Sequence, residues 1–120
     1  MRQKKISAEG RSFGNAFRGM GTLLKSQPHA RFHLLATVAV IALGVFCRIS
    51  RGEWLAIVLA VGLVWLAEGL NTALELLANA LDLGHHPLIK KAKDVAAAAV
   101  LLSALAALAI GLIVFLPRIF

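Results

Sequence analysis

The sequence predicts an all-α integral membrane protein with an N-terminal amphipathic surface helix and three transmembrane helices. Of its 120 residues, 59% are hydrophobic and only 16% are charged, and the mean hydropathy is +0.79. A soluble domain of this size could not hide that much apolar surface. Three apolar runs are long enough, or nearly long enough, to cross a bilayer.

The N-terminal part of the chain is polar first and amphipathic later. Residues 1–11 are expected to form a polar segment, ahead of a single membrane domain over 12–120. Apolar side chains then recur at helical spacing: Phe13, Phe17, Met20 and Leu24. This pattern predicts a helix over 12–26 that lies on the membrane surface or packs on the protein itself. Gln27-Pro28 should end it, because proline disfavours helical backbone at the residue before it.

Three spans are predicted after this helix, at about 33–49, 54–81 and 95–116. The second is about 42 Å long as a helix. It exceeds the roughly 30 Å hydrocarbon core, so one end must project. Residues 82–94 are expected to form the loop before the third span, and Pro117 should end that span.

The distribution of basic residues predicts the orientation of the spans. Ten basic residues precede the first span or lie in the second loop: Arg2, Lys4, Lys5, Arg11, Arg18, Lys25, Arg31, Lys90, Lys91 and Lys93. Only Arg48, Arg51 and Arg118 lie on the other side. The positive-inside rule therefore places the N-terminus in the cytoplasm, as expected for a multi-pass protein of the inner (cytoplasmic) membrane.

Several other classes of function are disfavoured. The net charge is +7, but the basic residues form no stripe with interleaved aromatics, which argues against nucleic-acid binding. No GxxxxGK[ST] motif occurs, so a soluble P-loop nucleoside triphosphatase is excluded. The single cysteine, Cys47, allows no intrachain disulfide.

Three polar side chains inside the second apolar run are the main candidates for chemistry. Glu68, Asn71 and Glu75 follow an i, i+3, i+7 spacing and therefore share one face of a helix. Acidic residues at membrane depth are costly and seldom serve packing alone. The stripe indicates a site that handles metal or protons, in the cytoplasmic third of the span.

Further charged residues are expected at the same cytoplasmic rim. Lys93 and Asp94 come just before the third span. They are expected at the same cytoplasmic rim as Glu75, which lies near the end of the second span. Carboxylates bind magnesium, lysine neutralises phosphate, and a further carboxylate accepts a proton from an attacking hydroxyl. This combination suits phosphoryl transfer to an alcohol.

The histidines are weaker candidates from their positions alone. His29 and His33 are four residues apart without a carboxylate nearby in sequence, so we expect them at the membrane interface. His85 and His86 project differently and have no cysteine nearby, which disfavours zinc. Trp65 is expected to be a packing residue.

The sequence resembles the small prokaryotic lipid kinases, the diacylglycerol kinase and undecaprenol kinase group. The matching segments run from about residue 12 to the end: Asn15–Gly19, Ala30–Ala36, Ala67–Glu75, His86–Leu88 and Ala92–Val100. The E-x-x-N-T-A-x-E segment followed by A-K-D is specific to this family. The resemblance implies a homotrimer with active sites shared between subunits, ATP as co-substrate with Mg²⁺, and a lipid alcohol as acceptor in the bilayer.

The resemblance also implies roles for individual residues. Glu68 resembles the general base and Asn71 the amide that orients the reacting groups. Glu75 resembles a carboxylate that binds metal and nucleotide. The remaining nucleotide contacts would come from Lys93, Asp94 and His86. Gln27 occupies the position of a second carboxylate for metal and nucleotide.

Two departures and several alternatives remain open. Gln27 replaces a family Glu, and Asn79 replaces a usual Asp, so metal and nucleotide contacts are expected to be altered. Undecaprenol is the favoured acceptor and diacylglycerol the alternative. A family member without catalysis, or a small channel lined by Glu68 and Glu75, are the rival functions.

Overall fold

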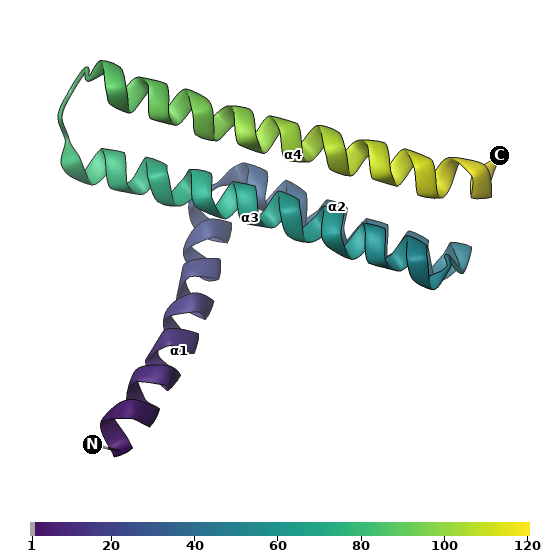
Figure 1. The fold of residues 1–120 in the computed structure, drawn as a ribbon, viewed down its shortest axis with the longest axis horizontal. Coiled ribbons are helices and arrows are strands. Elements are labelled where there is room, and N and C mark those ends of the chain that lie inside the picture. Colours follow the sequence, from purple (N-terminus) through teal and green to yellow (C-terminus); the bar gives the residue numbers. More distant parts are fainter. Residues whose placement is uncertain (1) are drawn as a thin grey trace. The chain divides into compact units, whose positions relative to one another are not determined.

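A computed structural model describes Arg2–Phe120, with side chains from Gly10 onward, as a succession of helices (Figure 1). The helices are α1 (Arg2–Ser26), α2 (Pro28–Cys47), α3 (Arg51–Leu81) and α4 (Pro87–Ile119). This described part contains no strand. It divides into two compact units, one ending at Phe32 and the other covering His33–Phe120.

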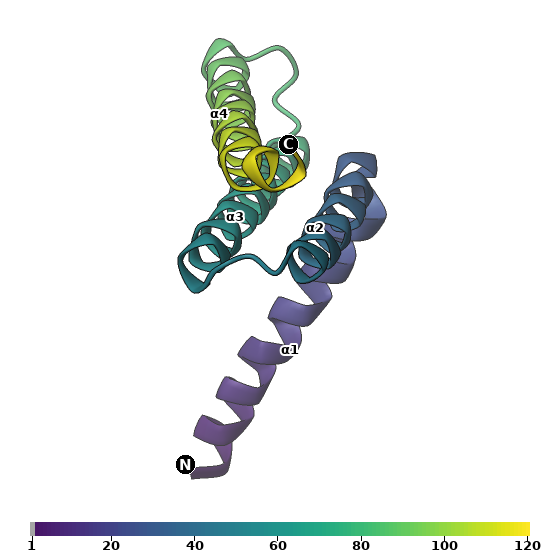
Figure 2. The same cartoon turned by 90° about the vertical axis from the view of Figure 1, so that its right-hand side faces the viewer.

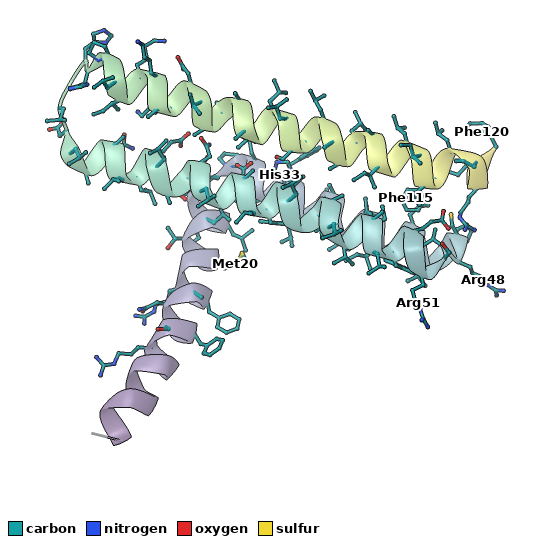
Figure 3. The ribbon with its side chains drawn as sticks, viewed as in Figure 1. Met20, His33, Arg48, Arg51, Phe115 and Phe120 are labelled. Carbon is teal, nitrogen blue, oxygen red and sulfur yellow. The ribbon has the colours of Figure 1, made fainter. Side chains whose placement is uncertain are left out.

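In the first unit, α1 carries the apolar stripe that the sequence predicts. Phe13, Phe17 and Met20 are all exposed along it (Figure 3). The helix begins at Arg2, however, so the polar segment over residues 2–11 is helical and continuous with it. Good helix formers such as Gln, Lys and Ala in that segment favour this extension. A location on the membrane surface stays a prediction.

The end of α1 is fixed by a side chain from the next helix. As predicted from Gln27-Pro28, α1 ends at Ser26, and Pro28 begins α2. The last carbonyls of a helix have no partner within it. Arg31 supplies donors to two of them, since its Nε lies 3.0 Å from Leu24 O and its Nη2 lies 3.0 Å from Lys25 O.

In the second unit, α3 and α4 lie side by side and run in opposite directions (Figures 1 and 2). Near the turn between α2 and α3, the buried side chains of Ile49 and Ile57 pack against Val114 and Phe115 of α4. Side chains of α2, including Val40, also contact this cluster. The three helices are therefore held together at the end opposite to the α3–α4 loop.

The start of α3 has a complete capping box. Ser50 Oγ accepts from Glu53 N at 3.2 Å, and Glu53 Oε1 accepts from Ser50 N at 2.9 Å. At the other end, Asp82 adopts left-handed backbone, with φ of 46°, and Gly84 follows with φ of 64°. These two residues let the chain leave α3 and reach α4 within residues 82–86.

The bounds of α4 differ from the prediction at both ends. His86 caps the helix, because its Nδ1 accepts from Leu88 N at 3.2 Å, and Pro87 occupies the first helical position. Prolines are favoured there, so residues 87–94 are helical and not a loop. At the other end the helix continues through Pro117 to Ile119. A proline in the last turn removes only one hydrogen bond, and Phe120 N still donates to Leu116 O at 2.9 Å.

The predicted membrane class is confirmed by three helices that are long and apolar enough to cross a bilayer, α2, α3 and α4. Their most apolar windows are only 11%, 28% and 17% buried within the chain. Most of their large apolar side chains therefore face outward, as suits a surface covered by lipid or by other membrane helices.

Candidate functional site

Glu68 is a buried acidic side chain in the middle of α3. Glu68 is 3% exposed to solvent, and Thr72, one turn later on the helix, is equally buried. Thr72 Oγ1 donates to Glu68 O at 2.9 Å, so this hydroxyl is satisfied by the backbone of its own helix. A carboxylate removed from water in this way needs a partner that compensates for its charge.

That partner comes from α2. His33 Nε2 lies 3.4 Å from Glu68 Oε2, and the two side chains are only 19% and 5% exposed. His33 is labelled in Figure 3, where α2 lies partly behind α3 in this view. The contact joins α2 to α3 across 35 positions of sequence.

Trp65 contacts the ring of His33, and Thr37 contacts its backbone. Its ring meets that of Trp65 edge to face, with centroids 6.5 Å apart and planes at 67°. Trp65 Nε1 donates to Thr37 Oγ1 at 3.0 Å, and Thr37 Oγ1 donates to His33 O at 2.7 Å. We call these three residues, His33, Thr37 and Trp65, the His33 cluster. It closes a ring of contacts beside Glu68.

Asn71 and Glu75 form a second polar pair on α3, closer to the α3–α4 loop. Asn71 Nδ2 donates to Glu75 Oε1 at 3.3 Å, one turn apart on the helix. Both residues are half-buried. The predicted stripe is therefore one face of a single helix, with Glu68 the most buried member and Glu75 nearest the end.

The first turns of α4 bring other predicted residues to the level of Glu75. Glu75 lies six residues before the end of α3 at Leu81, and Lys93 lies six residues after the start of α4 at Pro87. Each is therefore about 9 Å from its helix end. Since α3 and α4 pack as antiparallel neighbours, the two residues lie at the same level of the pair.

Asp94 forms an ion pair within α4. Lys90 Nζ donates to Asp94 Oδ2 at 3.1 Å, and both side chains are exposed. Lys93 is half-buried and lies on the adjacent face. His86, expected at the nucleotide, is the N-cap of α4 and is half-buried in this structure.

Gln27, the remaining predicted ligand, lies in the first unit between α1 and α2. It is half-buried, its N donates to Leu23 O at 3.2 Å, and its O accepts from Ala30 N at 3.1 Å. Its backbone thus closes the end of α1. The structure describes Gln27 and Glu75 within separate units.

The donor set agrees with the chemistry of magnesium. Within the described residues, no three His, Cys, Asp or Glu side chains gather to hold a metal ion. Magnesium, however, is commonly bound through one or two carboxylates together with water and substrate phosphates. Within the second unit, the carboxylate of Glu75 and the amide oxygen of Asn71 are ligands of the type that it prefers.

The contact between His33 and Glu68 is the feature that the sequence analysis missed. His33 was expected at the membrane interface with His29. A signal was present, because His33 lies at the start of an apolar run and Glu68 lies inside another. Polar groups at membrane depth tend to pair with one another.

Comparison with known proteins finds one matching family model and similar proteins from two organisms. The model of the family described as "Prokaryotic diacylglycerol kinase" matches residues 14–115. The undecaprenol kinase of Bacillus subtilis is 38% identical over 109 residues, which cover 91% of this chain and 89% of that protein. The diacylglycerol kinase of Synechocystis sp. is 38% identical over 108 residues, which cover 88% of this chain and 61% of that protein.

Proposed function

The chain belongs to the prokaryotic diacylglycerol kinase family, a family of membrane lipid kinases, and on that basis we propose that it transfers the γ-phosphate of ATP to the hydroxyl of a lipid alcohol. The observation that carries the proposal is the buried carboxylate of Glu68 on the same face of α3 as Asn71 and Glu75. A base at membrane depth suits an acceptor hydroxyl that arrives from the bilayer.

In the proposed reaction, the lipid hydroxyl oxygen attacks the γ-phosphorus in line with the leaving group. Glu68 accepts the hydroxyl proton as the new O–P bond forms. The bond between the γ-phosphorus and the bridging oxygen breaks, and ADP leaves with that oxygen. Positioning and charge neutralisation supply most of the catalysis in such reactions.

The other residues position the nucleotide. Glu75, with Gln27, would hold Mg²⁺, which when bound neutralises charge on the phosphates. Lys93 would contact phosphate oxygens, with Asp94 and His86 near the nucleotide. Asn71 would orient the reacting groups, and its bond to Glu75 supports a connected role for the two.

We favour undecaprenol as the acceptor and keep diacylglycerol as the alternative. The two relatives named for these lipids are equally identical to the chain, at 38%. The undecaprenol kinase, however, is matched over 89% of its length and the diacylglycerol kinase over 61%. The His-Pro-Leu segment at residues 86–88 also resembles the undecaprenol kinase group more closely.

The proposed setting is the inner (cytoplasmic) membrane, with the N-terminus in the cytoplasm. The ten-to-three distribution of basic residues supports this orientation. It places Glu75 and Lys93 at the cytoplasmic rim, where ATP is available. We further propose a homotrimer with sites shared between neighbouring subunits, and the outward apolar faces of α2, α3 and α4 are compatible with it.

The direct test is transfer of labelled γ-phosphate from ATP–Mg to lipid by the purified full-length protein in micelles. Undecaprenol and diacylglycerol are assayed in parallel. Glu68→Gln should lower the rate by about 10²- to 10⁴-fold, because it removes the base. Glu53→Gln is the matched control, since it neutralises another acid of α3 and should retain activity.

Each outcome of this assay is informative. Label in one lipid, lost in Glu68→Gln, would support the kinase and identify its acceptor. Absence of label in both lipids would argue for a family member without catalytic activity. Gln27 and Asn79, which replace acidic residues of the family, would be the first candidates for the cause of that loss. A separate measurement tests the channel: proton flux into liposomes that contain the protein, without ATP, would favour that function.

A further inference from the structure

We propose that His33 is a positioning residue for the carboxylate of Glu68, an inference that rests on the proposed lipid kinase function. His33 Nε2 lies 3.4 Å from Glu68 Oε2 in a buried contact between α2 and α3. With a hydrogen on Nε2, the imidazole presents a donor to this oxygen. The donor holds Oε2, and we assign proton transfer to the other oxygen, Oε1.

Burial makes the ionised form of Glu68 costly. Glu68 is 3% exposed to solvent, and it lies within α3, a helix that is apolar enough to cross a bilayer. An ionised carboxylate in such surroundings is costly unless a donor or a cation faces it. A base must be ionised before it can accept a proton, so the partner that stabilises the carboxylate also prepares it for its role.

The His33 cluster gives the imidazole a fixed direction. The ring of Trp65 packs against that of His33, and Trp65 Nε1 donates to Thr37 Oγ1 at 3.0 Å. Thr37 in turn donates to His33 O at 2.7 Å. The indole of Trp65 therefore restrains the imidazole directly, and Thr37 fixes that indole and the backbone of His33. The ring then has less side-chain freedom to lose when the site acts.

The contact geometry fits a group that tightens during the reaction. At 3.4 Å the two atoms are slightly farther apart than in an ordinary hydrogen bond between nitrogen and oxygen. Hydrogen bonds of catalytic groups are commonly long without substrate and shorten in the reacting complex. A small rotation of either side chain closes the remaining distance.

The test compares two replacements of His33 that are similar in size. His33→Gln retains an N–H donor near the position of Nε2, whereas His33→Leu has none. We expect His33→Leu to lower kcat by about 10- to 100-fold, the range seen when a residue that orients a functional side chain is removed. The KM for ATP–Mg should stay within about twofold, because that binding does not depend on Glu68. His33→Gln should keep kcat within about fivefold of the wild type.

Two further variants separate positioning from packing. His29→Leu is the matched control, because His29 is exposed and lies one turn earlier on α2. It should leave kcat unchanged. In protein that already carries Glu68→Gln, His33→Leu should cause no further loss, because there is no longer a base to position.

The failures of the two proposals can be told apart. A wild type that labels no lipid overturns the proposed function and this inference with it. A wild type that is active, with His33→Leu equally active, overturns the inference alone. Equal losses in His33→Gln and His33→Leu, or a further loss in the Glu68→Gln protein, would also overturn it and assign His33 a packing role. Circular dichroism and thermal midpoints of all variants accompany the kinetics.

Discussion

Arg118 in the last turn of α4 holds Glu53 in the first turn of α3 through both oxygens of the carboxylate. Its Nε donates to Glu53 Oε2 at 3.1 Å and its Nη2 donates to Oε1. Nη1 also lies 3.5 Å from Cys47 O at the end of α2. One side chain therefore ties the ends of three helices together, at the end of the second unit opposite to the candidate site.

Loss of the Arg118 contacts should lower the stability of the α2–α4 helix bundle without affecting catalysis. Arg118→Ala leaves Glu53 with only its cap to Ser50, so the end of α4 loses its anchor to α3. We expect the thermal midpoint in detergent to fall by a few degrees while kcat is retained at lower temperature. Arg118→Lys, which keeps the charge but not the two-pronged geometry, should recover only part of the loss. An unchanged midpoint in Arg118→Ala would contradict the structural role.

Gly44 is required by the close approach of Trp54 to α2. A Cβ at residue 44 would lie 2.7 Å from Trp54 Cη2 and 3.2 Å from Ile49 Cδ1. Gly44→Ala should therefore force the indole out of place and destabilise the protein by about 1–3 kcal/mol, as overpacking does. Gly52→Ala is the control, because a Cβ there meets nothing within 4 Å. Chemical unfolding of both variants, followed by tryptophan fluorescence, measures the difference.

Lys93 and Lys91 should differ in their effect on nucleotide binding. Lys93 is half-buried at the level of Glu75, whereas Lys91 is exposed. Lys93→Ala should raise the KM for ATP by about tenfold or more, as expected when a charged contact to phosphate is lost. Lys91→Ala should leave it within about twofold, because an exposed cation contributes little. If Lys93→Ala also leaves the KM for ATP within about twofold, neither lysine contacts the nucleotide.

A carboxylate at residue 27 should strengthen metal binding. Gln27→Glu adds a negative charge to the proposed ligand set, so the Mg²⁺ concentration for half-maximal activity should fall about 3- to 10-fold. Gln27→Ala should raise it, since it removes an oxygen ligand. Titration of Mg²⁺ at fixed ATP measures both. If neither variant shifts the midpoint of this titration, Gln27 is not a metal ligand.

The sequence predicted those features that depend on local pattern. The break at Gln27-Pro28 follows from proline sterics, and the shared face of Asn71 and Glu75 follows from helical spacing. Both are properties of a few neighbouring residues. They need no knowledge of how the helices pack.

The features that the sequence did not predict depend on which helices meet or on competition between local signals. His33 and Glu68 are 35 positions apart, and only the packing of α2 beside α3 brings them together. The predicted third span starts later than α4 because four of the eight residues 87–94 are charged, although His86-Pro87 is a capping signal. The pairing of Lys90 with Asp94 follows directly from helical i, i+4 spacing within residues 87–94.

The short connection between α3 and α4 also bears on the order of assembly. Residues 82–86 alone link the two helices, so closing this loop costs little chain entropy. The contacts between α3 and α4 nearest this loop join residues near in sequence, which favours early formation of this end of the pair. Glu75 and Lys93 thus reach a common level as soon as the hairpin forms in a newly inserted chain. Each chain then sets Glu75 and Lys93 at this common level by itself, before it meets any other molecule.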